Sequence, residues 1–134
     1  MLAPAIDGIR LSLHVLAATI WVGGQLTLAE LVPTVRKLSP EATRLAARAF
    51  ARLSWPAFVV LVLTGFWNLG AVDMSSQSTA WKIVLGIKIA VVAISGVSAY
   101  IHTKAKSTVG LAVWGSISGL SAVAALVIGV FLAN

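Results

Sequence analysis

The sequence predicts an all-α integral membrane protein in which four antiparallel helices form one bundle. Hydrophobic residues make up 59% of the 134 residues and charged residues only 10%, with a mean hydropathy of +0.98. A soluble domain is about 25% charged. The apolar residues gather in four segments, each close to the roughly 20 residues that a spanning helix needs. Short joins separate these segments, so consecutive helices should run in opposite directions.

The four segments define the expected elements. We expect spans at residues 9–35, 53–72, 81–102 and 108–133, which make residues 1–134 a single domain. No cleavable signal peptide is expected, because charged residues precede the first span and no small-residue cleavage site follows a short apolar core. Cysteine is absent, which excludes disulfides, thiolate metal sites and cysteine nucleophiles.

The short segments between the spans contain residues that typically start or end helices. Ser39, Pro40 and Glu41 read as an N-cap, a proline at the first helical position and an acid in the first turn. The second helix should therefore begin in water and enter the membrane near Leu53. Gly70 suits its end. The caps expected for the third and fourth helices are Ser78 or Thr79, and Ser107 or Thr108.

Lysine and arginine in the loops predict the orientation, because these residues favour the cytoplasmic side. The first and third joins carry most of them: Arg36, Lys37, Arg44, Arg48, Arg52, Lys104 and Lys106. The other side has only Arg10 and Lys82, offset by Asp7 and Asp73. We therefore expect both termini on the outer side of a multi-pass protein of the bacterial inner (cytoplasmic) membrane.

A basic stripe follows the first join. Arg44, Arg48 and Arg52 recur every four residues and so share one helix face. The net charge of +6 sits beside apolar spans, which favours contact with anionic lipid headgroups over nucleic acid. Docking of an acidic partner is the alternative for this stripe. A homo-oligomer or a membrane redox partner also stays open.

Polar side chains are expected at one depth. His14 lies a few residues below the outer surface on the first helix, and Lys88 is seven residues past Trp81, about 10 Å deep at ~1.5 Å per residue. Thr64 and Asn68, one turn apart on the outward-running second helix, fall in the same outer half. Polar groups at membrane depth are costly, so they normally face the bundle interior and often mark function.

The helix faces agree with this convergence. His14, Trp21 and Gln25 share one side of the first helix at heptad-like spacing. A seven-residue repeat on the third helix makes one stripe of Trp81, Lys88, Ser95 and His102. The fourth helix carries small residues at Gly115, Ser118, Gly119, Ser121 and Ala122, which let helices approach closely or leave room for a flat ligand.

Each polar residue has a functional and a structural interpretation. His14 either ligates a metal or haem, or pairs with a neighbouring helix. Lys88 either contacts an anionic ligand group or snorkels outward along its stem. Trp21 is too deep for an interfacial belt and is expected to line a pocket. Glu30 is expected to pair with Arg36 or Arg52.

Residues 13–24, Leu-His-Val-Leu-Ala-Ala-Thr-Ile-Trp-Val-Gly-Gly, resemble the copper-resistance D (CopD) domain family of bacterial membrane proteins. Residues 31–33, residues 63–65 and Lys88 match that family too. A more distant similarity is to HemJ, the family of membrane protoporphyrinogen oxidases, which has four helices, a first-helix His followed by Trp and Gly, and a third-helix Lys. That family is understood to bind b-type haem through this His. The resemblance implies that His14 and Lys88 are the functional pair.

Three functions stay open. The first is a haem b protein with a redox role, such as a membrane oxidoreductase. In this interpretation His14 is the axial ligand and Lys88 lies near the haem carboxylates. The residues expected around the cofactor are Trp21, Gln25, Thr64 and Asn68. The second is a copper uptake or resistance protein, in which His14 acts with Met74 or Asp73. The third is a small structural or assembly subunit of a membrane complex.

Electrostatics favours haem over copper. An ammonium group beside a cation site repels the ion, whereas it stabilises a carboxylate in a low-dielectric setting. Soft copper prefers thiolate and thioether ligands. The chain has no Cys, and Met74 is its one methionine besides Met1.

Overall fold

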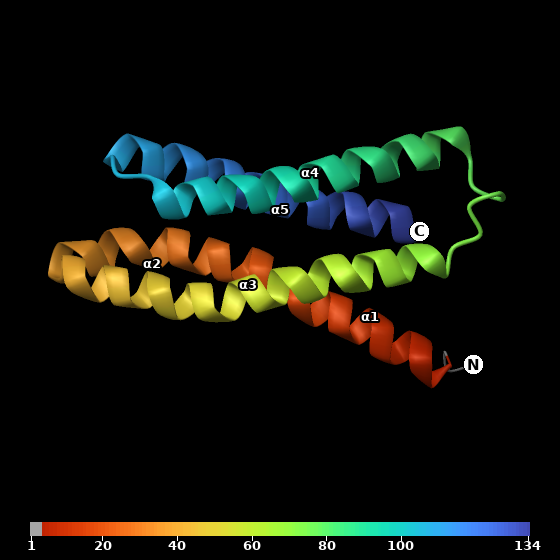
Figure 1. Ribbon diagram of the computed structural model, residues 1–134, viewed down its shortest axis with the longest axis horizontal. Coiled ribbons are helices and arrows are strands. Elements are labelled where there is room, and N and C mark those ends of the chain that lie inside the picture. The colour runs from red at the N-terminus through yellow and green to blue at the C-terminus, as the bar shows by residue number, and fades with distance from the viewer. Residues whose placement is uncertain (1–3) are drawn as a thin grey trace. The chain divides into compact units, whose positions relative to one another are not determined.

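The computed structural model describes residues 4–134, which form two compact units divided between Val72 and Asp73. Each unit is a hairpin of long helices (Figure 1). Among the described residues, four continuous helical rods are long and apolar enough to cross a membrane: Ala5–Leu38, Pro40–Gly70, Thr79–Lys104 and Thr108–Ala133. The chain is thus an all-helical, multi-pass membrane protein, as predicted, with rods longer than the expected spans at most ends.

The first rod of the first unit contains a change of helix type. It consists of α1 (Ala5–Ala18), the π-helical turn η1 (Thr19–Gly23) and α2 (Gly24–Leu38), with no break between them. A π-turn inside an α-helix often occurs at a functional position. Here it carries Trp21, the aromatic residue singled out from the sequence.

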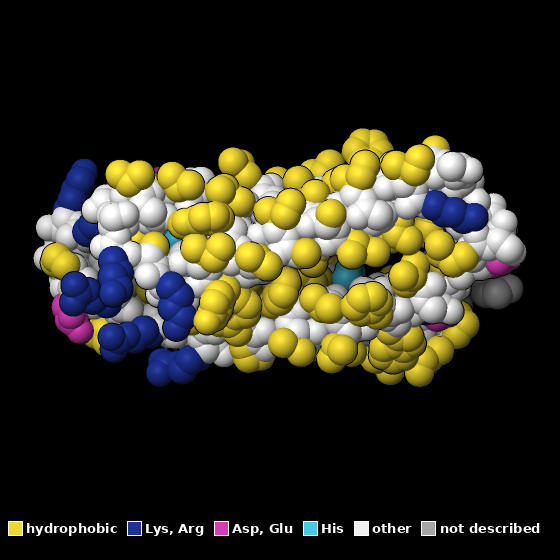
Figure 2. Space-filling view, turned by 45° about the horizontal axis from the view of Figure 1, so that its top comes forward, with side chains coloured by type: hydrophobic (Ala, Val, Ile, Leu, Met, Phe, Trp, Pro, Cys, Tyr) yellow, Lys and Arg dark blue, Asp and Glu magenta, His cyan; other side chains and the backbone are white. Residues whose placement is uncertain are grey.

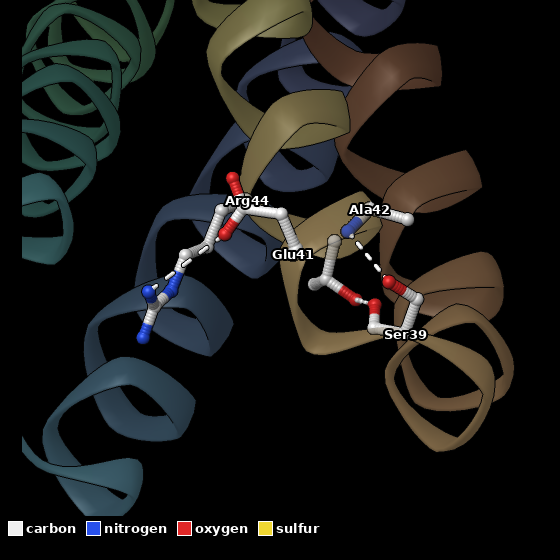
Figure 3. A network of polar contacts seen from close by, with 5 residues as sticks. Ser39, Glu41, Ala42 and Arg44 are labelled. Atoms are coloured by element: carbon white, nitrogen blue, oxygen red, sulfur yellow. Dashed lines mark hydrogen bonds and ion pairs between the residues drawn. The ribbon is translucent and has the colours of Figure 1, made fainter.

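The second rod, α3 (Pro40–Gly70), begins and ends where the sequence predicts. The Ser39 hydroxyl accepts a hydrogen bond of 3.1 Å from the backbone N–H of Ala42, and Glu41 lies in the first turn (Figure 3). Glu41 also lies 4.0 Å from Arg44. These contacts satisfy a backbone donor that a bare helix start would leave unpaired and place a negative charge at the positive end of the helix dipole.

The side-chain contacts show that α3 runs antiparallel to the first rod. Trp21, only 3% exposed, packs against α3 with ring centroids 4.4 Å from Phe58 and 5.5 Å from Trp55. One turn further along the first rod, Gly24 faces Phe50, and a Cβ on Gly24 would overlap the Phe50 ring. Gly24 therefore allows the first rod to pack closely against α3. A Cβ on Gly23 would meet open space.

The pairing predicted for Glu30 is wrong. Among the described residues the ion pairs are Asp7–Arg10 and Glu41–Arg44, and Glu30 is exposed. Arg36 is six residues from Glu30 on the same rod, whereas side chains meet on a helix at spacings of three or four. Phe50 faces Gly24, and Arg52 is two residues past Phe50 on the antiparallel helix, in the direction away from Glu30. Glu30 is six residues beyond Gly24, so Arg52 and Glu30 are more than a helical turn apart.

Basic side chains gather where α2 meets α3, as Figure 2 shows for this end of the first unit. All of them are exposed: Arg36, Lys37, Arg44, Arg48 and Arg52. The stripe is therefore open to a binding partner, and its contact with anionic lipid stays a prediction.

The second unit consists of α4 (Thr79–Lys104) and α5 (Thr108–Ala133). Both predicted caps are present. The Ser78 hydroxyl accepts from the backbone N–H of Trp81 at 3.1 Å, and the Ser107 hydroxyl accepts from that of Gly110 at 2.9 Å. The unit is therefore a hairpin whose two helices each begin at a serine.

The predicted seven-residue stripe of α4 faces α5. At its centre Ser95 and Ser118, 1% and 2% exposed, each donate a hydroxyl hydrogen to the other's backbone carbonyl, at 3.0 and 2.9 Å. Such reciprocal bonds need helix backbones that lie close together, which small residues permit. Of the two uses expected for the small residues of α5, the structure shows close helix approach at Ser118.

The ends of the stripe are bonded to α5 as well. The indole N–H of Trp81 donates to the carbonyl of Leu132 at 3.2 Å. The Nδ1 atom of His102 lies 2.9 Å from the carbonyl of Leu111, so Nδ1 carries the hydrogen, because a carbonyl can only accept. This bond joins α4 to α5 at the other end of the stripe.

Candidate functional site

The candidate site lies between α1 and α3 and is built on His14. The Nδ1 atom of His14 lies 2.8 Å from the hydroxyl of Thr64 on α3. Thr64 is 5% exposed and His14 is half-buried. Two of the residues singled out from the sequence are thus in direct contact, at the same level of the first unit.

The direction of this hydrogen bond follows from the other contact of Thr64. Its hydroxyl also lies 2.6 Å from the carbonyl oxygen of Val60 in the preceding turn of α3. Two oxygens at that distance need a hydrogen between them, and the carbonyl has none. The single hydroxyl hydrogen of Thr64 therefore points to Val60, and Nδ1–H of His14 donates to Thr64.

This arrangement selects one tautomer of His14. With the hydrogen on Nδ1, the neutral imidazole has its lone pair on Nε2. An imidazole held in this way through Nδ1–H is oriented to offer Nε2 to an iron or another metal ion, since ligating histidines almost always donate their other ring N–H to a fixed acceptor. Thr64 is thus a positioning residue for His14.

Two further polar side chains belong to the same pair of helices. Arg10 lies one turn before His14 on α1, and its side chain is 12% exposed and pairs with Asp7 at 3.0 Å. Its Nε–H is buried without a hydrogen-bond acceptor, and the side-chain oxygen of Asn68 on α3 is buried without a donor. Asn68 was expected here from the sequence. Arg10 was counted only as a charge on the outer side, although its spacing of four from His14 could have revealed it.

The other candidates of the first unit have structural contacts. Trp21 packs against Trp55 and Phe58, about two helical turns from His14. Gln25 is half-buried, and its side-chain nitrogen is buried without an acceptor. The structure thus places His14, Thr64 and Trp21 at the contact between the first rod and α3, and a role of Trp21 or Gln25 toward a cofactor stays a prediction.

Lys88 lies in the second unit. It is half-buried, and its Nζ is 2.9 Å from the point where a Cβ would stand on Gly129 of α5. The absence of a side chain at Gly129 makes room for the ammonium group on the face of α5. The predicted meeting of Lys88 with His14 joins residues of different units and stays a prediction.

The loop residues considered for copper also belong to the second unit. Asp73 and Met74 are exposed. The hydroxyl and the backbone N–H of Ser75 donate to the Asp73 carboxylate at 2.6 and 3.0 Å, and these bonds lower the pKa of Asp73 below its ordinary value. The carboxylate therefore acts as a cap for the turn that precedes α4.

No group of three or more His, Cys, Asp or Glu side chains that could hold a metal ion occurs within residues 4–134. The chemistry available at the α1–α3 contact is instead that of one oriented imidazole beside an arginine and an amide. Comparison of the chain with protein-family models, with curated proteins and with solved structures gives no match. The candidate site is therefore defined by its own residues.

Proposed function

We propose that this chain is a membrane haem protein in which His14 is the axial ligand of haem b through Nε2. The observation that carries the proposal is the Nδ1–H donation of His14 to Thr64, which places the lone pair on Nε2 and holds the ring. A histidine is the usual axial ligand of b-type haem iron, and a fixed partner on the other ring nitrogen is its usual companion.

The number of protein ligands favours haem over copper. A porphyrin supplies four nitrogen ligands itself, so the iron needs only one or two side chains, and His14 can be one of them. A copper ion draws all of its ligands from the protein and prefers sulfur in its reduced state. The chain has no Cys, and Asp73, a candidate copper ligand, already accepts two hydrogen bonds from Ser75.

The residues of this chain would bind and orient the cofactor. His14 would hold the iron, and Thr64 would keep the imidazole in one rotamer. Haem supplies one-electron redox chemistry when it is bound. The proposed role is electron transfer in the bacterial cytoplasmic membrane, with a second membrane component as the redox partner.

A titration of the purified protein with haem b tests the proposal. In nanodiscs, we expect one haem to bind per chain, with a Soret band shifted from that of free haem. A parallel titration with copper by calorimetry should give no binding that depends on His14. Copper binding that is lost in His14→Ala, together with an unshifted Soret band, would move the assignment to copper. Absence of both would favour the structural subunit.

Thr64→Val should lower the affinity for haem about tenfold, since the loss of a partner to a metal-bound histidine typically costs 10- to 100-fold. Valine keeps the shape of threonine but cannot accept the Nδ1–H of His14. The control is Thr27→Val, because the Thr27 hydroxyl donates only within its own helix, to the carbonyl of Gly23 at 2.7 Å. Equal affinities of the two variants in the haem titration would contradict a positioning role of Thr64.

A further inference from the structure

We propose that Arg10, with Asn68, binds a carboxylate group of the ligand that His14 holds. The inference deepens the proposed function and rests on it. It names the anion-binding end of the same site and assigns it to residues within the first unit.

The register of the helices puts the two side chains at one level. His14 on α1 contacts Thr64 on α3, Trp21 contacts Phe58, and Gly24 faces Phe50. The first rod and α3 thus run antiparallel, so residues before His14 lie beside residues after Thr64. One turn before His14 is Arg10 and one turn after Thr64 is Asn68, which extends the α1–α3 seam by one level toward the N-terminus of α1.

Arg10 has hydrogen-bonding capacity that its own unit leaves unused. The Asp7 carboxylate forms an ion pair with one terminal nitrogen of the guanidinium at 3.0 Å, while the Nε–H of Arg10 is buried without an acceptor. A guanidinium has five N–H donors in a planar fork that fits a carboxylate. Burial of such a donor is costly unless an acceptor reaches it. An oxygen of a bound anion would supply that acceptor.

Asn68 presents a second unsatisfied group on the same seam, since its side-chain oxygen is buried without a donor. The oxygen and nitrogen of an amide can exchange places by a half turn of the amide plane. The group can therefore either accept from a protonated carboxyl or donate to a carboxylate.

The spacing suits one rigid ligand. Arg10 and His14 are four residues apart on α1, so they share a face and differ by about 6 Å along the helix axis at 1.5 Å per residue. A flat macrocycle held at its centre by His14 and carrying carboxylates at its edge would present one of them to Arg10. Haem b has this form. A lipid phosphate offers the same oxygens but has no bond to His14.

The experiment compares haem b with its dimethyl ester, in which both carboxylates are blocked, in phosphatidylcholine nanodiscs. We expect the wild-type protein to bind haem b about tenfold more tightly than the ester, as charge-assisted hydrogen bonds predict. Arg10→Gln should bind both forms with equal affinity and keep the Soret band. Arg10→Lys should keep part of the preference. The matched control is Lys82→Gln, an exposed cation at the start of α4, which should keep all of it.

The outcomes separate this inference from the proposed function. If the wild-type protein binds both forms equally through His14, the Arg10 assignment is overturned and the haem proposal stands. If neither form binds, the haem proposal itself fails. Loss of the preference in Lys88→Met but not in Arg10→Gln would assign the carboxylate to Lys88. A preference that disappears in phosphatidylglycerol nanodiscs would mean that Arg10 binds lipid phosphate. The wild-type comparison needs no variant, so it decides the question even if Arg10→Gln does not fold.

Discussion

His14→Ala should lower the affinity for haem b by on the order of 100-fold or more and remove the shifted Soret band. The expected loss exceeds that for Thr64→Val because the variant removes the iron ligand itself, whereas loss of its hydrogen-bond partner costs 10- to 100-fold. The measurement is the haem titration in nanodiscs, followed by absorption spectroscopy. Far-UV circular dichroism should show that the helices are kept, because the ring is only half-buried.

The matched control for this variant is His102→Ala. His102 is the other histidine of the chain, and its Nδ1–H donates to the carbonyl of Leu111 in the second unit. It should keep the Soret band. Free imidazole added to His14→Gly should restore part of the band, because it can replace the missing ligand. A His14→Ala protein that binds haem as tightly as the wild type would show that the iron ligand lies elsewhere.

Gly24→Leu should destabilise the first unit by about 1–3 kcal/mol, the usual range for overpacking of a well-packed contact. The reason is local: even a Cβ at this position would overlap the Phe50 ring, so either the ring must move or α3 must separate from the first rod. The Trp21–Phe58 contact lies one turn away and would be loosened by such a separation. Reversible unfolding in mixed micelles measures the change.

The neighbouring residue supplies the control for this prediction. A Cβ at Gly23 meets open space, so Gly23→Leu should be tolerated with little loss of stability. Phe50→Ala should relieve much of the cost of Gly24→Leu, so that the two substitutions are non-additive in a double-mutant cycle. Equal stabilities of the Gly23 and Gly24 variants would contradict the close contact of Gly24 with Phe50.

Local signals in the sequence predicted the elements well. Hydropathy identified all four spanning helices, and Ser39, Ser78 and Ser107 cap the helices that they were expected to cap. These signals depend on residues within one or two helical turns of each other, so they act in the same way whatever the rest of the chain does. The sequence also predicted that His14 and Thr64 lie at the same depth, because the depth of a residue in a membrane is set by its distance along the helix from the helix end.

The candidate site was predicted in part. The sequence pointed to His14, Thr64 and Asn68, which lie on one seam in the structure, but it counted Arg10 only as a charge on the outer side and assigned Glu30 to an ion pair. Both misassignments concern charged residues at the ends of the first rod. Charge counts place such residues on a side of the membrane and say nothing about which helix face they occupy.

The sequence by itself determined that this chain is a four-span helical membrane protein with a histidine, a threonine and an amide at one depth. Only the tertiary structure decided that Nδ1–H of His14 donates to Thr64, that a donor of Arg10 is buried one turn away, and that Gly24 receives the ring of Phe50. The physical reason is that hydropathy and capping act along one chain segment, whereas a hydrogen bond between helices depends on their rotation and register. Those two variables are set by the packing of all the side chains in the contact, and no single spacing in the sequence encodes them.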